Sequence, residues 1–453
     1  MQEYNQETVQ ALKDVYQSAK SGSYDIYVVF IEKGANLLCQ NGYLGFIAPH
    51  KFFNAGYGRN LRQFLSRQKL VRKVVHFQDF QVFEKATTYT CLLFLQKCEN
   101  KNIEVAKVER AHFLPQSLQS LSFEIINSDN WTSENWTIVP TRSTAILRKM
   151  DTNPKLHEIT SNIFQGPKSG ADDVFIFELL SQSEKVAICY SHSIGGKFKI
   201  ENQILRKYIK GKNLRRYYVD YSANEYTIFP YDRAGKLFSQ EVLRNKHPLA
   251  FSYLSLPQNK KILCSRERGR FKEQWWAYSR PQNMGIVFSL KILTPFNAFR
   301  NSFALDNKGD FVFSAGVSGA YGILIRSDVG IANEYLLVLL NSRLSEFFIR
   351  NTSTCLRGGF YSYENKYIKN IPIRTIDFHN PDDVSKHDRM VKLVEQMLDL
   401  HKQLVAAKIP DEKTKIQRQI DTTDKQIDNL VYDLYGLTEE EIKIVEESLN
   451  NDR

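Results

Sequence analysis

The chain has 453 residues, of which 42% are hydrophobic and 25% are charged. These values are ordinary for a globular protein of two or three domains. No apolar run is long enough to cross a bilayer, and the polar start Met1-Gln2-Glu3 is unlike a signal peptide. The six cysteines are scattered, without a Cys-x-x-Cys pair, which argues against a zinc site and a disulfide scaffold and is typical of the reducing cytoplasm.

The positive charge is concentrated in one part of the chain. The formal net charge is +11. Between Lys197 and Arg300 there are 21 Lys and Arg against 7 Asp and Glu, whereas the remaining residues have 40 against 43. A basic face of this kind neutralises phosphates and releases their counterions, so nucleic acid is the first partner to consider. The alternative is a basic surface that only maintains solubility.

The first hundred residues alternate helical and strand-like segments. Apolar spacing predicts helices at 25–40 and 58–68, and strands at 43–48, 71–77 and 88–96. We expect 43–48 to be a buried parallel strand, because it is a short apolar run. This order suits the second half of a doubly wound α/β sheet that ends in an antiparallel hairpin. Five elements cannot cover both faces of such a sheet, so we expect an open edge that further N-terminal chain or a partner completes.

The remaining chain is predicted to form a connector, a second domain and a tail. We assign residues 1–107 to the partial α/β domain and 108–154 to a connector, which Trp131 and Trp136 pin through their indoles. Residues 155–380 alternate short strands, turns and helices, and are assigned to an α+β domain.

Within that second domain, apolar spacing predicts a single helix over 332–350. The tail, residues 381–453, is predicted to contain a helical hairpin, with helices at 384–407 and 411–435. Gly436 then ends the second helix, and Thr438 with Glu441 forms a capping box for a last one. We interpret the hairpin as a brace on the second domain. The alternative, an oligomerisation arm, is less favoured because few clean heptads are present.

Three segments of the first domain resemble adenine-specific DNA methyltransferases. Tyr24–Gly34 is similar to the helix that follows the catalytic tetrapeptide of that family, and Gly42–Phe53 is similar to the next strand and its turn. Val82–Thr90 is similar to the hairpin turn before the last strand. In the family an aromatic residue at this turn stacks on the flipped-out adenine, and Phe83 occupies the matching position. The resemblance implies a base-stacking role for Phe83. From residue type alone, Phe83 would be a core residue at a strand end.

A second resemblance covers the basic part of the chain. Tyr208–Tyr217, with the sequence Tyr-Ile-Lys-Gly-Lys-Asn-Leu-Arg-Arg-Tyr, is similar to the opening of the target-recognition domain of TaqI-like and type IIG restriction–modification enzymes. Leu340–Leu344, Arg357–Tyr361 and Ile371–Ile373 follow in that family's order and spacing, and 427–438 fits its usual ending. The matches together extend over most of the chain.

The residues expected to bind DNA lie in two basic runs and one glycine pair. Most Lys and Arg in such runs contact phosphates, and one or two Arg reach guanine edges. Two adjacent glycines let backbone approach a phosphate or a groove, although a tight loop is an equal alternative. The predicted DNA-binding residues are Lys207, Lys210, Lys212, Arg215, Arg216, Arg266, Arg268, Arg270, Lys272, Arg357, Gly358 and Gly359.

The motifs for catalysis are not found in the sequence. A cofactor-binding sheet of this type needs a glycine-rich turn after its first strand and an acid after its second. Gly56-Tyr57-Gly58 lacks that acid, and we interpret it as the start of a helix. Neither Asn153-Pro154-Lys155 nor Asn380-Pro381-Asp382 matches the family's Asn-Pro-Pro-Tyr motif. His50 and His76 have no sequence partner for catalysis and are interpreted as core residues.

These observations lead to one interpretation and two alternatives. The fold class is predicted as α/β plus α+β: the second half of a Rossmann-like methyltransferase sheet, a TaqI-like target-recognition domain and a C-terminal helical hairpin. The resemblance implies that the chain recognises double-stranded DNA. It also implies that a methyl group is transferred from S-adenosylmethionine to a flipped adenine only when an N-terminal catalytic half is present. Alone, the chain is expected to bind DNA but not the cofactor.

The first alternative is a separately encoded specificity subunit that works with a catalytic chain in trans. RNA modification is less favoured, because no RNA-binding module is recognisable. The recognised DNA sequence does not follow from the chain, because side chains on irregular loops have no positional code.

Overall fold

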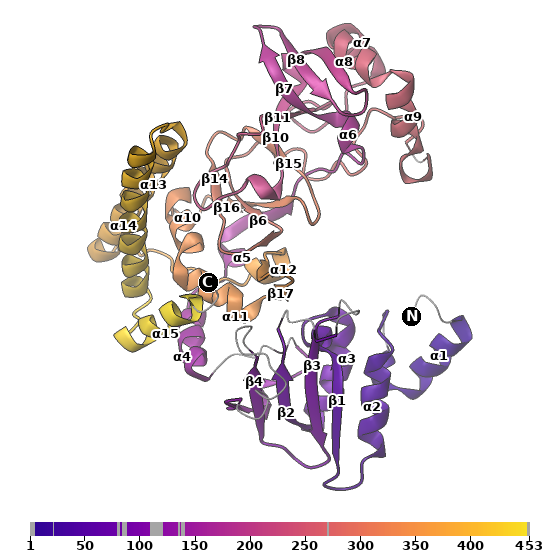
Figure 1. Cartoon of the computed structure of the whole chain (residues 1–453), viewed down its shortest axis with the longest axis vertical. Coiled ribbons are helices and arrows are strands. Elements are labelled where there is room, and N and C mark those ends of the chain that lie inside the picture. The colour runs from indigo at the N-terminus through magenta and orange to yellow at the C-terminus, as the bar shows by residue number, and fades with distance from the viewer. Residues whose placement is uncertain are drawn as a thin grey trace. The chain divides into compact units, whose positions relative to one another are not determined.

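The computed structural model describes residues 5–20, 22–78, 82–83, 88–108, 121–134, 136, 141–269 and 271–450. The chain divides into two compact units (Figure 1). Unit 1 contains Met1–Arg148 and the later segment Arg350–Tyr361. Unit 2 contains Lys149–Ile349 and Ser362–Asn451.

Unit 1 is built on a five-stranded sheet with the order β1-β3-β2-β4-β5. Strand β3 lies between β1 and β2 and is antiparallel to both, while β2 and β4 are parallel. The strands are β1 (Tyr43–Pro49), β2 (Val71–His76), β3 (Thr90–Gln96), β4 (Asn102–Lys107) and β5 (Glu124–Asn127). The helices are α1 (Gln6–Val15), α2 (Tyr27–Leu37), α3 (Arg59–Arg67) and α4 (Thr141–Asp151), whose last residues enter unit 2.

The core of unit 1 is formed by the inward faces of α2, α3 and the sheet. Val28 and Ile31 on α2, Leu61 on α3 and Leu93 on β3 are fully buried. Trp131 and Trp136 stack on each other at a ring distance of 4.5 Å, and both are buried in this core. The segment predicted as a connector, residues 108–154, is therefore attached to unit 1 by these two indoles, as predicted.

Strand β1 differs from its sequence prediction. It pairs in antiparallel fashion with β3, and it is an end strand of the sheet formed by the described residues. Its side chains alternate between exposed and partly buried, and Ile47 is 45% exposed. The prediction of a buried strand between parallel neighbours was therefore wrong. An apolar run indicates that the side chains on both faces of a strand favour burial. It does not indicate whether the strand has a neighbouring strand on each side.

Unit 2 contains two sheets that share one hydrophobic core. The larger has six strands in the order β15-β10-β11-β7-β8-β9, and the smaller has four in the order β14-β12-β16-β6. Only the β10–β15 pair of the larger sheet is parallel. The strands are β6 (Thr160–Gln165), β7 (Ile176–Gln182), β8 (Val186–Ser191), β9 (Gly196–Glu201), β10 (Leu205–Ile209), β11 (Glu225–Ile228), β12 (Lys291–Pro295), β14 (Ala304–Asp306), β15 (Phe311–Phe313) and β16 (Ala320–Ile325).

Short strands and helices complete the middle of the chain. The short strands are β13 (Asn297–Ala298), β17 (Cys355–Leu356) and β18 (Phe360–Ser362). The helices are α5 (Leu156–Ile159), α6 (Asp172–Phe175), α7 (Gln240–Lys246), α8 (Pro248–Leu254), α9 (Pro257–Ser265), α10 (Asn333–Asn341), α11 (Arg343–Thr352) and α12 (Asn365–Ile368).

The single helix predicted over 332–350 is two helices. Ser342 separates α10 from α11, with a backbone ψ of 154° that ends the first. Its Oγ donates to the carbonyl of Leu339 and accepts from the N–H of Ser345, so the same side chain ends one helix and caps the next. The apolar periodicity continues across the break, which explains why the pattern alone predicted one helix.

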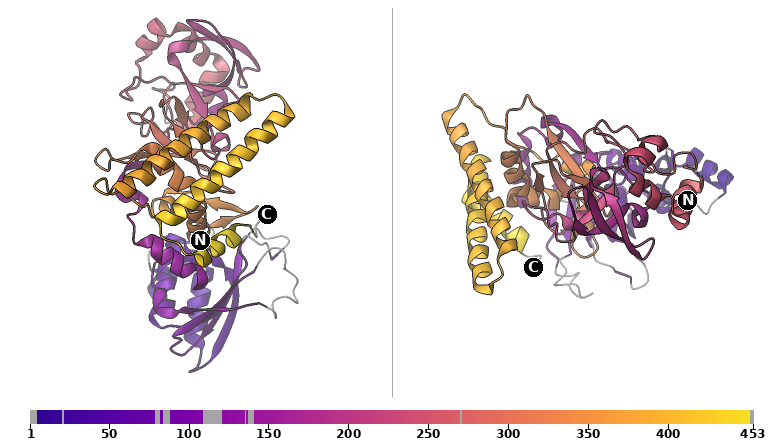
Figure 2. Two further views of the ribbon diagram at one scale, coloured as in Figure 1. Left: turned by 90° about the vertical axis from the view of Figure 1, so that its left-hand side faces the viewer. Right: turned by 90° about the horizontal axis from the view of Figure 1, so that it is seen from above.

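Three helices form the end of the chain. Helices α13 (Pro381–Ala406) and α14 (Pro410–Leu434) are joined by residues 407–409 and lie side by side (Figure 2). Helix α13 also packs on α10. Gly436 has a φ of 64°, which ends α14, and Thr438 and Glu441 form the predicted capping box of α15 (Glu439–Asn450). Among the described residues, every helix is too short or too polar to traverse a lipid bilayer.

Candidate nucleic-acid interface

Three loops of unit 2 lie close in backbone, two of them against each other and the third against the end of β15. They are residues 166–170, 210–213 and 314–319, and we call them the three-loop cluster. A Cβ at Gly166 would lie 1.7 Å from the carbonyl oxygen of Phe313, and one at Gly211 would lie 2.5 Å from that of Gly319. The N–H of Gly211 also donates to the carbonyl of Ser318 at 2.9 Å. Only glycine permits these approaches, so the loops are held in fixed positions.

Lysine side chains point outward from this cluster. Lys168 and Lys212 are exposed, and the described residues provide neither with an ionic partner. Lys168 pairs through its backbone with Arg280, which is also exposed. These two residues are 112 positions apart, so no sequence pattern identified them as neighbours. The cluster therefore presents positive charge that is available for a ligand.

Several predicted DNA-binding residues are held in surface ion pairs. Lys207 on β10 lies 3.4 Å from Asp310, and Lys210 lies 3.1 Å from Glu225. Arg215 is exposed, donates to the carbonyl of Leu214 and lies 3.5 Å from Asp220. Exposed pairs of this kind contribute little stability, and a phosphate can exchange with their carboxylates.

Arg216 is directed into the protein. Its guanidinium pairs with Asp424 on α14 and donates to the carbonyl of Asn341 at 3.1 Å. Burial lowers the pKa of Arg216, but Tyr217, Asp424 and Asp428 together raise it above its usual value. Burial in turn raises the pKa of Asp428 to about 7. Arg216 therefore attaches the helical tail to the second domain and is not part of the proposed interface.

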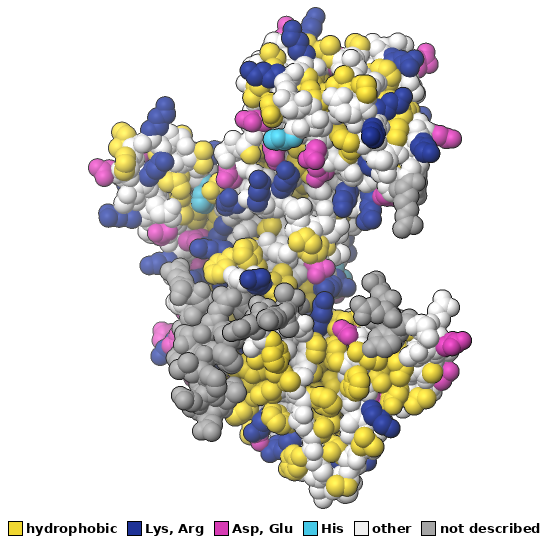
Figure 3. All heavy atoms as spheres, turned by 45° about the vertical axis from the view of Figure 1, so that its right-hand side comes forward, with side chains coloured by type: hydrophobic (Ala, Val, Ile, Leu, Met, Phe, Trp, Pro, Cys, Tyr) yellow, Lys and Arg dark blue, Asp and Glu magenta, His cyan; other side chains and the backbone are white. Residues whose placement is uncertain are grey.

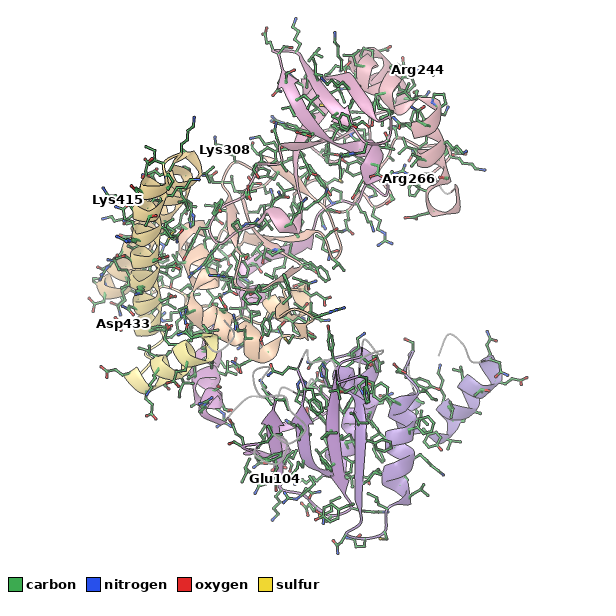
Figure 4. The ribbon with its side chains drawn as sticks, in the orientation of Figure 1. Glu104, Arg244, Arg266, Lys308, Lys415 and Asp433 are labelled. Carbon is green, nitrogen blue, oxygen red and sulfur yellow. The ribbon has the colours of Figure 1, made fainter. Side chains whose placement is uncertain are left out.

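Arg266 at the end of α9 is also internal (Figure 4). Its three guanidinium nitrogens donate to the carbonyls of Leu263, Ser169 and Trp275, at 3.0, 2.5 and 2.7 Å. The side chain is 7% exposed, and burial lowers its pKa. It organises the backbone around the three-loop cluster and does not reach the surface.

The rest of the second basic run is only partly described. Lys272 is exposed and has no ionic partner among the described residues. The side chain of Arg268 and all of Arg270 lie outside the described residues. Lys260 lies over the Trp275 ring at 5.3 Å, and Arg244 on α7 lies over Phe251 at 4.9 Å.

The exposed cations extend well beyond the two predicted runs. Figure 3 shows many Lys and Arg side chains on the face of unit 2 that it presents. Between 155 and 300, exposed cations without an ionic partner among the described residues are Lys168, Lys185, Lys197, Lys199, Lys212, Arg233, Lys236, Arg244, Lys246, Lys260, Lys261, Lys272, Arg280 and Arg300.

Arg357, Gly358 and Gly359 form the tip of a β-hairpin. Strands β17 and β18 pair through Cys355 with Tyr361 and through Leu356 with Phe360. The two glycines have φ values of 86° and 77°, so the turn itself requires glycine. Arg357 is exposed at this tip. The tight loop, one of the two alternatives for this glycine pair, is found here as a turn between two strands.

Phe83 is a surface residue of unit 1. Its side chain is 46% exposed, so the core position that its residue type suggested is not found. Residues 84–87, which share its predicted turn, lie outside the described residues. His50 is buried in unit 1 and stacks at 4.2 Å on the partly buried His76, in keeping with the predicted core role. Burial lowers the pKa of both, that of His50 to about 4.

The glycines of unit 1 do not fit a cofactor turn. Gly56–Gly58 forms a short 3₁₀ turn that leads into α3. A Cβ at Gly58 would lie 2.2 Å from the carbonyl oxygen of Phe52, so its own chain requires this glycine. No S-adenosylmethionine site follows from this turn.

Two family models match the chain. Residues 1–83 match the Eco57I restriction-modification methylase family, and residues 206–373 match the TaqI-like C-terminal specificity domain. The chain carries a TaqI-like specificity domain and an Eco57I-type methylase segment. The specificity domain contains β10, the three-loop residues from 210 onward and the Arg357 hairpin.

The relatives are type II restriction–modification proteins. The type II restriction enzyme and methyltransferase RM.Eco57I of Escherichia coli is 28% identical over 97% of this chain and 46% of its own length. The type II methyltransferase M.BstVI of Geobacillus stearothermophilus is 22% identical over 94% of this chain and 69% of its own. The chain thus spans about half the length of the first of these.

A solved structure has a similar fold. The type IIL restriction-modification enzyme MmeI, determined in complex with DNA, superimposes with a TM-score of 0.59 at 12% identity, over 99% of this chain and 55% of the MmeI chain. The likeness concerns the fold of the specificity domain and the methylase segment, which is mixed α/β with several sheets.

Proposed function

We propose that the chain recognises double-stranded DNA as the specificity-bearing part of an adenine-specific DNA methyltransferase in a restriction–modification system. The observation that carries this proposal is the three-loop cluster, which holds Lys168 and Lys212 exposed on a fixed backbone, without ionic partners among the described residues. Phosphate contacts by such cations position a protein on DNA. We propose Lys207, Lys210, Arg215 and Lys272 of unit 2 as further phosphate contacts, and Arg357 on its own hairpin as another.

A salt titration tests the DNA-binding proposal. We expect the full chain to bind a labelled random-sequence duplex with an affinity that falls steeply between 50 and 200 mM salt, by a slope of roughly −0.9 per phosphate contact. The double substitution Lys168→Glu and Lys212→Glu should make this slope shallower by about 2 and weaken binding to all duplexes similarly.

The matched control is Lys415→Glu on α14, which is also exposed but lies outside the three-loop cluster (Figure 4). We expect this variant to bind as the unaltered chain does. A salt-independent affinity, or an equal loss in the control, would show that the basic surface serves solubility.

We further propose that methyl transfer requires a preceding catalytic half that pairs with β1. The end position of β1 and its exposed Tyr43 and Ile47 support this, because an exposed apolar strand edge is normally covered. Phe30 and Leu37 on the neighbouring helix α2 are exposed as well, and Figure 3 shows hydrophobic side chains gathered on the surface of unit 1. S-adenosylmethionine would be bound by that half, since the Gly56–Gly58 turn leads into α3 and does not fit the cofactor.

Phe83 is proposed to stack on the flipped adenine in the completed enzyme. Its exposure supports this role, because a residue that receives a base cannot be enclosed in the core. With the catalytic half restored, Phe83→Ala should lose roughly 1–3 kcal/mol of base stacking. A 2-aminopurine at the target adenine should then fluoresce more strongly while methyl transfer slows.

The control for this experiment is thermal unfolding of the chain alone, which we expect Phe83→Ala to leave almost unchanged. Unfolding at ordinary temperature, with unchanged fluorescence in the remaining complex, would assign Phe83 to the core. A separately encoded specificity subunit is the second candidate, and it predicts that the catalytic half works equally well when supplied as a separate chain.

A further inference from the structure

The loop between β15 and β16 has a composition that neither the charge pattern nor the family resemblance explains. Its sequence from Ser314 to Gly319 is Ser-Ala-Gly-Val-Ser-Gly. Every residue except Val317 is Ser, Ala or Gly, so the loop is narrow. Val317 is 72% exposed, although an isolated valine gains nothing from contact with water. A single exposed apolar residue is ordinary, and its meaning depends on how it is held.

The loop is held rigidly. The N–H of Gly319 donates to the carbonyl of Gly316 at 2.8 Å, and the N–H of Ala320 donates to that of Ser314 at 3.0 Å. Gly316 has a φ of 91°, and a Cβ at Gly319 would lie 1.9 Å from the Ser314 oxygen. The carbonyl of Gly319 also accepts from the N–H of Phe296 at 3.2 Å. This backbone requires its glycines and presents Val317 in one position.

The surroundings of the loop favour DNA. Ser318 accepts from the N–H of Gly211, which places the loop next to the exposed and unpaired Lys212. The acids of the neighbouring strands are neutralised, because Glu225 pairs with Lys210 and Asp310 pairs with Lys207. A narrow apolar tip beside a free cation matches a groove whose walls carry phosphates and whose floor carries base edges.

We propose that the loop 314–319 enters the major groove and that Val317 contacts the methyl group of a thymine, while Lys212 contacts a flanking phosphate. This deepens the proposed function and rests on it. In the major groove the thymine methyl is the apolar group that distinguishes one base pair from the others, and an aliphatic side chain is suited to recognise it. Val317 would therefore determine sequence preference, whereas Lys212 would determine affinity.

A selection experiment tests this assignment. The full chain is incubated with a library of random duplexes, and the bound fraction is sequenced. The selection is repeated with a library in which uracil replaces thymine and so removes only the methyl group. For the unaltered chain we expect one base pair at which thymine is enriched, with an enrichment that falls about fourfold in the uracil library, the contribution of one buried methyl group.

Val317→Ala should show the same base preference at that position with the thymine library and with the uracil library. Its affinity for the unselected pool should stay within about twofold of that of the unaltered chain. Val405→Ala is the matched control, because Val405 is also 72% exposed but lies at the end of α13. It should leave the thymine preference intact. Lys212→Ala should weaken binding of both libraries equally. Thermal unfolding of each variant checks the fold.

The following outcomes would contradict the proposed role of Val317. If Val317→Ala retains the thymine preference, or if uracil changes no position in the unaltered chain, the assignment of Val317 is wrong while DNA binding stands. A chain that binds duplexes without any preference also overturns it. A chain that fails to bind duplexes overturns both this assignment and the proposed function.

Discussion

At the scale of single residues, the cations of the two basic runs have different roles. Lys212 is exposed and free of ionic partners among the described residues, whereas Arg216 pairs with Asp424 and Arg266 is enclosed by backbone carbonyls. The sequence correctly indicated a basic region, because charge density can be counted. It could not separate surface cations from internal ones, because their partners are up to 208 residues away.

Arg266 should matter for stability and not for DNA binding. Lysine cannot supply three donors in a planar fork, so Arg266→Lys leaves buried carbonyls without partners. We expect a loss of roughly 1–3 kcal/mol in the free energy of unfolding for each unpaired group. Chemical denaturation measures this loss, and Lys272→Ala serves as the surface control. A change in the salt slope of DNA binding by folded Arg266→Lys would contradict the internal role.

Asp428 should make stability depend on pH. Burial raises the pKa of Asp428 to about 7 from the usual value near 4, so the folded state favours the protonated carboxyl. Between about pH 4 and 7 the unfolded chain therefore binds fewer protons at this site, and stability falls as pH rises. Asp428→Asn should flatten this part of the profile, since the amide oxygen can still accept from the Arg343 N–H.

The measurement is the unfolding midpoint at a series of pH values between 4 and 8, for the unaltered chain and for Asp428→Asn. Asp433→Asn is the control, because Asp433 is exposed on the same helix (Figure 4). Parallel profiles for Asp428→Asn and the unaltered chain would show that Asp428 is charged throughout, with Arg216 and Arg343 compensating for its burial.

At the scale of elements, local sequence determined most helices and strands, but not their surroundings. The capping box of α15 and the glycine after α14 were predicted because both depend on residues within one turn. The break at Ser342 and the edge position of β1 were missed. Both depend on a backbone geometry or a neighbour that apolar periodicity does not encode.

The β1 edge should drive self-association of the chain alone. A lysine on an edge strand discourages pairing with a further strand, so Ile47→Lys should lower the aggregated fraction at high protein concentration. Light scattering over a concentration series measures this. Ile262→Lys on α9 is the control, because Ile262 is exposed but not on a sheet edge. Equal improvement by both variants would indicate a general effect of charge.

The same substitution should prevent activity when a catalytic half is co-expressed, because the added strand could no longer pair with β1. Restored methyl transfer by Ile47→Lys would contradict the proposed pairing while leaving DNA binding untouched.

At the scale of the whole molecule, the two units have separate cores, so we expect them to unfold in two transitions. Leu61 is fully buried in unit 1 and Leu293 in unit 2. Leu61→Ala should lower the free energy of unfolding of unit 1 alone, and Leu293→Ala that of unit 2 alone. Each loss should be about 2–5 kcal/mol. Calorimetry measures both. A single transition that moves with either variant would show one cooperative unit.

The segment Arg350–Tyr361 restricts which parts of the chain can be exchanged between relatives to change DNA specificity. It groups with unit 1, although the chain on both sides of it groups with unit 2. A recombination event that replaced everything after Arg148 would therefore import a foreign piece into the recipient's unit 1. A graft that exchanges 149–349 and 362–451 while retaining 350–361 would keep each core with its own residues. Protein engineers who seek new target sequences should transplant this chain as two inserts and not as one.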